Sequence, residues 1–270
     1  MANNTIQFFP SLTAFLDYVT PDAWGRVRQS AQFMAADNVE QCKDYVRRGA
    51  TEAEQVQARK LLDKIDTQTH GRKRRAWDNA VSGERVNVGA ALAGHPQAMR
   101  RRVKVVHERA PLRVFVEVSV SGSVTVEELE KRGAVVAALA VRLAEIRPVQ
   151  LWACWLSAPR HDDTAPRYGG AVRLETSPLS MATAIAVLAK PQFTRGLRFA
   201  ALHKMQARSA WDTVYSAYRE QNRAQVMRQA FGMEPQDIYV PGGSFDESPE
   251  WMRDPVAWVN SYLDPQRDAE

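Results

Sequence analysis

Two basic clusters are the residues whose types and spacing most directly indicate chemistry. Their members are Arg72, Lys73, Arg74, Arg75, Arg100, Arg101 and Arg102, and Trp77 closely follows the first cluster. Lysine and arginine engage phosphates, and an aromatic ring beside them can stack on a base. The clusters therefore predict contact with nucleic acid. The alternative is a solvated loop, or a surface that docks an acidic partner.

The composition sets limits on that prediction. The formal net charge of the 270 residues is +5, which is mildly basic, so binding to nucleic acid would be weak and would fall quickly with salt. Hydrophobic residues make up 45% and charged residues 25%, as in an ordinary globular protein. The two cysteines, Cys42 and Cys154, do not make a disulfide scaffold. Because no CxxC motif occurs, the sequence also gives no support for a metal bound by cysteine.

Few other residues have the spacing of a catalytic site. His161, Asp162 and Asp163 lie together in a predicted polar loop, and Gly242-Gly243-Ser244 is a weak phosphate-loop candidate that opens no helix. No GxGxxG, Walker or GxSxG motif occurs. A third hypothesis is a metal-dependent hydrolase that uses Glu117 and Asp162. It ranks last, because the sequence shows no acid and base residues at a spacing that would bring them together. The sequence favours a protein that is not an enzyme and needs no cofactor.

Targeting signals are missing from the sequence. The N-terminus lacks a basic region followed by a long apolar stretch, which is the pattern of a secretion signal. The apolar stretches near 134–143 and 149–156 are too short or too interrupted to span a bilayer. We therefore expect a cytoplasmic protein with no membrane partner.

The order of predicted elements indicates an α/β fold. Residues 1–83 are predicted to form an N-terminal helical segment and a basic linker, and residues 84–270 an α/β domain with its core at about 112–263. Predicted strands alternate with helices through this core, which implies a mostly parallel, Rossmann-like sheet flanked by helices. Ligands of such sheets bind at the carboxyl ends of the strands. The predicted strands are Leu112–Val120, Val149–Leu156, Ala171–Glu175, Gly196–Leu202 and Asp237–Val240.

The end of the first core strand carries the most informative motif. Glu117, Ser119 and Ser121 alternate there, and Thr125-x-x-Glu128 then opens a predicted helix. This arrangement resembles the metal-ion-dependent adhesion site of von Willebrand factor A (VWA) domains, whose motif is Asp-x-Ser-x-Ser. The resemblance covers roughly Leu112–Leu263. The alternative is that the serines cap the helix and that Glu117 is an exposed strand residue.

The VWA resemblance implies a degenerate site for a divalent cation such as Mg²⁺. Glu117, Ser119 and Ser121 fall on the three motif positions, with glutamate replacing aspartate, and the longer side chain moves the carboxylate by about 1.5 Å. Thr176 or Ser177 would supply the family's threonine. The family's aspartate is missing where it would be expected, at Leu202-His203-Lys204.

The same resemblance implies a non-enzymatic interaction module. Its binding face would hold Ser119, Ser121, Ser123, Thr176 and Ser177, on loops at the carboxyl ends of the strands. VWA domains are often paired with an AAA-type ATPase, which is therefore the implied protein partner. The helical N-terminal part and the segment 86–99 also resemble bacteriophage-encoded proteins of unassigned function, which would place the protein in the host cytoplasm. The nucleic-acid hypothesis remains the alternative function.

Overall fold

Two compact units make up the chain, and each contains its own sheet. The computed structural model describes residues 5–21, 34–64, 75–82, 85–104, 111–119, 124–157, 167–176, 179–205, 223–242 and 253–268. The larger unit, called the core unit here, comprises Met1–Ile65 and Pro111–Glu270. The smaller one, the inserted unit, comprises Asp66–Ala110. The predicted division at residues 83 and 84 therefore differs from the one in the structure, because the N-terminal elements pack with the core sheet.

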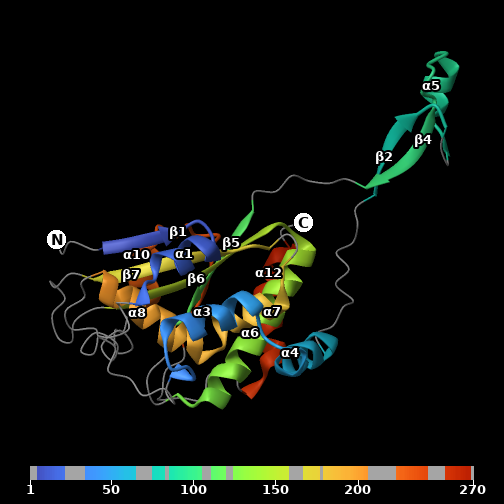
Figure 1. Ribbon diagram of the computed structural model, residues 1–270. Coiled ribbons are helices and arrows are strands. Elements are labelled where there is room, and N and C mark those ends of the chain that lie inside the picture. The colour runs from blue at the N-terminus through green and yellow to red at the C-terminus, as the bar shows by residue number, and fades with distance from the viewer. Residues whose placement is uncertain are drawn as a thin grey trace. The chain divides into compact units, whose positions relative to one another are not determined.

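The core unit is built on a five-stranded sheet of order β1-β7-β6-β5-β8 (Figure 1). Three of its four neighbouring strand pairs are parallel, and the β6–β7 pair is antiparallel. The prediction of a mostly parallel α/β sheet flanked by helices is thus confirmed. The strands are β1 (Thr5–Phe9), β5 (Leu112–Glu117), β6 (Val149–Ser157), β7 (Tyr168–Leu174) and β8 (Ile238–Val240).

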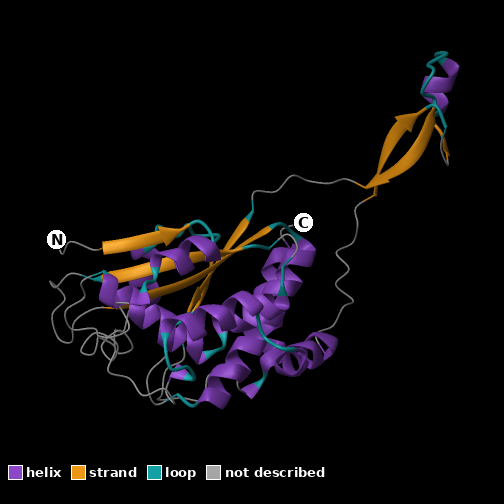
Figure 2. Cartoon of the chain, viewed as in Figure 1, coloured by secondary structure: helices purple, strands orange, loops and turns teal. Residues whose placement is uncertain are grey.

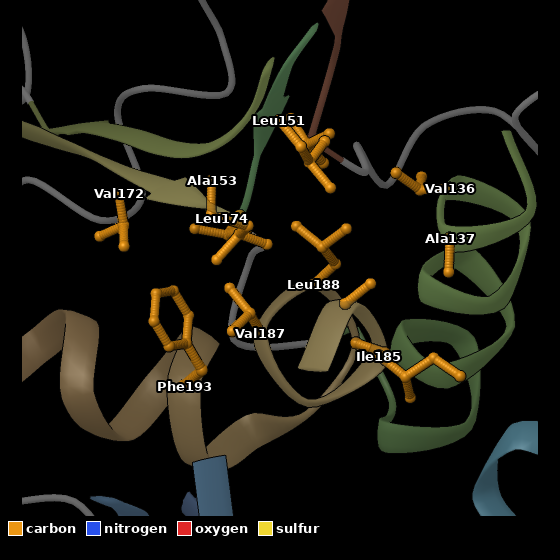
Figure 3. Packing of buried hydrophobic residues seen from close by; sticks show 14 of the residues in the cluster. Val136, Ala137, Leu151, Ala153, Val172, Leu174, Ile185, Val187, Leu188 and Phe193 are labelled. Carbon is orange, nitrogen blue, oxygen red and sulfur yellow. The ribbon is translucent and has the colours of Figure 1, made fainter. Parts of the chain in front are cut away.

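Helices cover both faces of this sheet. On one face, side chains of β6 and β7 such as Leu151 and Leu174 meet Val187 and Leu188 of α7 (Figure 3). On the other face, Phe115 and Cys154 pack with Phe231, next to α10. The core helices are α1 (Leu12–Tyr18), α3 (Val39–Arg48), α4 (Glu52–Lys64), α6 (Val126–Ile146), α7 (Met181–Leu188), the π-helix η2 (Gln192–Leu197), α8 (Arg198–Lys204), α10 (Arg223–Ala230) and α12 (Pro255–Asp268).

The predicted helical N-terminal segment is present, but a strand precedes it. Thr5–Phe9 forms β1, which pairs in parallel with β7 in the register Thr5↔Tyr168. The helices that follow bury Phe15, Val39 and Leu61 in the main apolar cluster. The N-terminal segment is therefore part of the core unit.

The long helix α6 starts where its capping signal predicts. The Thr125 side chain accepts a hydrogen bond from the Glu128 backbone N–H, and the Glu128 carboxylate accepts one from the Thr125 backbone, which completes a capping box. Thr125 is therefore the N-cap, so the alternative in which Ser119 and Ser121 cap this helix is wrong. The helix runs for 21 residues and presents Val136, Ala137 and their neighbours to the apolar cluster (Figure 3).

The predicted strand Gly196–Leu202 is wrong. The chain is helical there, with η2 followed directly by α8. Every residue from Phe193 to Leu202 is buried, so the apolar pattern has no solvent-exposed side from which a period of 2 or 3.6 could be read. Ala200 and Ala201 favour a helix in such an ambiguous run.

The inserted unit is a small antiparallel sheet of order β2-β4-β3 with one short helix (Figure 2). Its elements are β2 (Arg75–Ala80), β3 (Arg85–Val86), α5 (Val88–Leu92) and β4 (Met99–Lys104). Asn87 caps α5 by accepting a hydrogen bond from the Ala90 N–H. The predicted basic linker therefore contains a regular strand, β2. No helix in the described part of either unit is long and apolar enough to cross a membrane.

Candidate functional site at the carboxyl ends of β5, β6 and β8

Three parallel strands end side by side in the core unit. The register places Glu117 of β5 opposite Cys154 of β6, and Val116 opposite Val240 of β8. This edge of the sheet is called the carboxyl edge below. It is the position where an α/β sheet presents residues to a ligand.

Glu117 lies at the centre of the carboxyl edge and is 1% exposed. One carboxylate oxygen accepts a hydrogen bond from the Arg223 guanidinium at 2.6 Å. The other accepts one from the Tyr239 hydroxyl at 2.5 Å and one from the Gly242 backbone N–H at 3.3 Å. The expectation of an exposed strand residue is therefore wrong, because Glu117 is an internal anchor. The Gly242 N–H is committed to Glu117, which removes a donor from the weak phosphate-loop candidate.

Two arginines tie the strand ends together through backbone carbonyls. Arg132 of α6 donates to the Glu117 carbonyl at 2.8 Å and to the Pro241 carbonyl at 2.7 Å, which joins β5 to the chain just after β8. Arg223 also donates to the Leu156 carbonyl of β6 at 3.0 Å. Charge-assisted bonds of this kind are stronger than neutral ones. The carboxyl edge is therefore cross-linked from α6 and from α10.

Burial and neighbouring charges determine the protonation states of Glu117 and Cys154 at this edge. Burial by itself raises the pKa of Glu117, but the charge of Arg223 and hydrogen bonds from Arg223, Tyr239 and Gly242 outweigh it, so the pKa lies below its ordinary value of 4.5. The pKa of the Cys154 thiol is raised well above 9.0, first by burial and then by the Glu117 carboxylate. At neutral pH the edge thus holds a carboxylate paired with arginine and an inert thiol.

Ser119 is the motif serine that the structure describes. It is 3% exposed, and its hydroxyl has no hydrogen-bond partner within the described residues. A buried hydroxyl without a partner typically costs about 1–3 kcal/mol of stability. The motif residues Ser121 and Ser123 lie outside the described residues, as does Ser177.

Thr176 is far from the carboxyl edge. Because β7 runs antiparallel to β6, its end lies beside the start of β6, where the Thr176 hydroxyl donates to the Val149 carbonyl. Val149 and Cys154 are five residues apart on one strand, which is about 17 Å at 3.3–3.4 Å per residue. The expectation that Thr176 shares a face with Ser119 is therefore wrong.

The described residues do not fit a divalent cation. Both oxygens of Glu117 already accept hydrogen bonds from protein donors, and the Arg223 guanidinium beside them repels a cation. Thr176 is at the opposite edge. The described part of the chain contains no group of three or more His, Cys, Asp or Glu side chains that could hold a metal. In this structure the arginine supplies the positive charge that a metal would bring to Glu117.

The Glu117 network was missed from the sequence. Arg132, Arg223 and Tyr239 are separated from Glu117 by 15, 106 and 122 residues, so no local spacing reveals them. Arg132 sits in the charged run Glu130-Lys131-Arg132, which resembles a solvated helix face. Asp162, the other residue of the hydrolase hypothesis, lies outside the described residues.

The basic clusters belong to the inserted unit. Arg75 and Trp77 lie on β2, and the cluster Arg100–Arg102 lies on β4, the strand paired with it. The register brings Trp77 opposite Arg102 and Arg75 opposite Lys104. Arg72, Lys73 and Arg74 fall outside the described residues. Arg75 of the first cluster and the whole second cluster are therefore neighbours in one small sheet.

The core unit is an α/β protein with a mostly parallel sheet and a charge-locked carboxyl edge. The chain belongs to the family described as "Domain of unknown function (DUF7192)", whose model matches residues 2–265. The match spans both units, so the inserted sheet lies within the family's domain. Comparison with curated proteins and comparison with solved structures both yield no match.

Proposed function

We propose that the protein is a non-enzymatic interaction module that binds a protein partner through the carboxyl edge of its core sheet. The observation that carries this proposal is the Glu117–Arg223 pair, which closes at 2.6 Å beneath that edge. The pair holds the ends of β5 and β6 in one fixed arrangement. A rigid edge reduces the ordering that a surface must undergo when it binds.

The chemistry of the edge supports binding over catalysis. A catalytic acid or base needs a pKa near the working pH and a path to the substrate. Glu117 is buried with a lowered pKa, and Cys154 is buried with a raised one. Among the described residues at this edge, the ionisable groups are therefore committed to internal bonds or kept in their unreactive form.

The VWA-like character of the core remains part of the proposal. It is supported by the alternation of Glu117 and Ser119 at the end of a buried strand that leads into a capped helix. The altered metal motif indicates a partner that binds without a metal. By the same resemblance, an AAA-type ATPase is the class of partner to test first, and a bacteriophage is the proposed source.

The test is capture of partners from lysate of the native cell by the tagged full chain, with and without nuclease treatment. We expect one protein to remain bound to the tagged chain after nuclease treatment. The double variant Ser119→Ala with Ser121→Ala should no longer bind that protein. Thr176→Ala is the matched control, because it removes a hydroxyl from the opposite edge. If the double variant and the control retain the partner equally, the carboxyl edge is not the binding face.

A further inference from the structure

The net positive charge of the chain is concentrated in the inserted unit. Residues 66–110 contain ten lysines and arginines but four aspartates and glutamates, while the whole chain has a net charge of +5. The remaining residues are therefore close to neutral. A local excess of one sign marks a surface that attracts the opposite charge.

Strand pairing sorts these residues onto two faces of the small sheet. Residues directly opposite each other in an antiparallel ladder lie on the same face, and successive residues alternate between faces. One face, named the basic face, holds the pairs Arg75↔Lys104 and Trp77↔Arg102 together with Asn79, Arg100 and Arg85, which meet across β2, β4 and β3. The other face holds Ala76↔Val103, Asp78↔Arg101 and the set Ala80, Met99 and Val86.

The two faces differ completely in chemistry. Among the residues paired in the three strands, the basic face carries five cationic residues, a tryptophan and an asparagine, and no acid. The opposite face is mostly apolar, and its two charged residues, Asp78 and Arg101, are a pair of opposite sign. The run Arg100-Arg101-Arg102 is therefore split, with its middle member on the apolar face. No reading of the run as a simple charge cluster reveals this division.

Like charges lie directly opposite each other on the basic face. Arg75 lies directly opposite Lys104, and Arg85 directly opposite Arg100. Like-charged pairs at such positions destabilise a sheet. Arg85 and Arg100 are both exposed, so a polyanion has access to them. An anionic ligand that lies across the face would interact favourably with cationic residues of all three strands.

We infer that the basic face binds single-stranded nucleic acid without regard to sequence. The cationic residues would contact successive phosphates, and Trp77, in the middle strand position of β2, would stack on an unpaired base. A β-strand of six residues is about 20 Å long, which accommodates a short stretch of extended single-stranded nucleic acid. This inference is independent of the proposed function, since it concerns a different unit and a different ligand.

The expected salt dependence follows from the number of cations. Each phosphate contact to a single strand contributes about −0.7 to the slope of log K against log salt, so five contacts give a slope of up to about −3.5. Loss of one contact should reduce the steepness by about 0.7 and weaken binding by about fivefold at 0.1 M salt. Loss of the stacked ring should weaken binding by about fivefold or more and leave the slope unchanged.

The test is fluorescence anisotropy of the full chain with a labelled oligothymidylate of about 20 nucleotides, over a range of salt concentrations. Arg102→Ala and Arg101→Ala are the decisive pair, because they remove the same charge from adjacent residues on opposite faces. We expect Arg102→Ala to weaken binding and flatten the slope, while Arg101→Ala has little effect. Trp77→Ala should weaken binding at every salt concentration. Trp77→Phe keeps an aromatic ring and should retain most of the wild-type affinity.

Three results would overturn the inference. One is a wild-type chain that does not bind the oligonucleotide at low salt. Another is an Arg101→Ala variant that loses as much affinity as Arg102→Ala, which would make net charge the determinant and not the face. The third is equal displacement of the oligonucleotide by a duplex of the same length or by polyglutamate, since neither offers an unpaired base. Unchanged circular dichroism of each variant confirms that the fold is retained.

Discussion

Glu117 and Arg223 meet at 2.6 Å inside the core unit although 106 residues separate them in the chain. Their side chains are 2% and 14% exposed, so the pair lies almost entirely out of water. It fixes α10 to the ends of β5 and β6 and positions the carboxyl edge. We expect this pair to contribute to the stability of the core unit and to determine its response to magnesium.

Glu117→Gln should destabilise the core unit by about 3 kcal/mol, because removal of one partner leaves the charge of Arg223 buried and uncompensated. Urea denaturation followed by circular dichroism would measure the change. The control is Glu127→Gln, which breaks the exposed Lys131–Glu127 pair at 2.8 Å and should leave the midpoint unchanged. A Glu117→Gln midpoint equal to that of the wild type would show that the pair does not stabilise the fold.

Acid should destabilise the protein in a window that Glu54 helps to define. Burial by itself raises the pKa of Glu54, but hydrogen bonds from Lys190, Thr51 and Tyr45 outweigh it and lower the pKa to about 2. A carboxyl with a depressed pKa in the folded state contributes stability above its ordinary pKa of 4.5 and loses it as the pH falls toward about 2. The melting temperature of the wild type should therefore decrease as the pH is lowered from 4.5 to about 2. The melting temperature of Glu54→Gln should decrease less steeply over the same range. If the melting temperatures of the two proteins decreased equally with pH, Glu54 would not contribute to the acid sensitivity.

Magnesium should not stabilise the protein. The oxygens of Glu117 accept bonds from Arg223, Tyr239 and Gly242, which leaves no free carboxylate for the ion. A ligand that binds the folded state at 100 times its Kd would add about 2.7 kcal/mol, which a thermal melt detects readily. We expect the same melting temperature with millimolar Mg²⁺ and with a chelator. A Mg²⁺-dependent rise that Glu117→Gln abolishes would restore the metal site.

Gly133→Ala should destabilise the core unit although alanine favours a helix by about 1 kcal/mol over glycine. A Cβ at position 133 of α6 would lie 1.9 Å from the Ala189 Cβ and 2.6 Å from the Ala189 Cα, at the end of α7. Such overlaps force the two helices apart. Thermal denaturation would measure the loss, and Ala189→Gly should restore only part of it, because the backbone of residue 189 would still overlap the added methyl group. A Gly133→Ala variant as stable as the wild type would contradict this packing.

Neither cysteine should react in the folded protein. Burial raises the pKa of Cys42 to about 12, and Cys154 is fully buried with a raised pKa. Because the thiolate is the reactive form, a disulfide reagent such as DTNB should label no thiol in native buffer and two thiols in denaturant. Rapid labelling of one cysteine at neutral pH would show that its surroundings open in solution.

Local signals in the sequence predicted several elements correctly. Thr125 and Glu128 specify the start of α6 because a capping box depends only on residues three positions apart. The β-branched runs at Leu112 and Val149 predicted β5 and β6, and their alternation with helices predicted a mostly parallel sheet. Charge and aromatic content singled out the segment that contains Trp77. In each case the determining interactions lie within a few residues of one another.

What only the tertiary structure decided were partners and directions. The sequence could not show that β7 runs antiparallel to β6, and that direction alone moves Thr176 away from Ser119. Nor could it show that Thr5–Phe9 is a strand, because its partner β7 begins more than 150 residues later. The pairing of Glu117 with Arg223 and the split of Arg101 from Arg102 likewise depend on strand register and long-range packing. These features arise from interactions between segments distant in the chain, which no local pattern encodes.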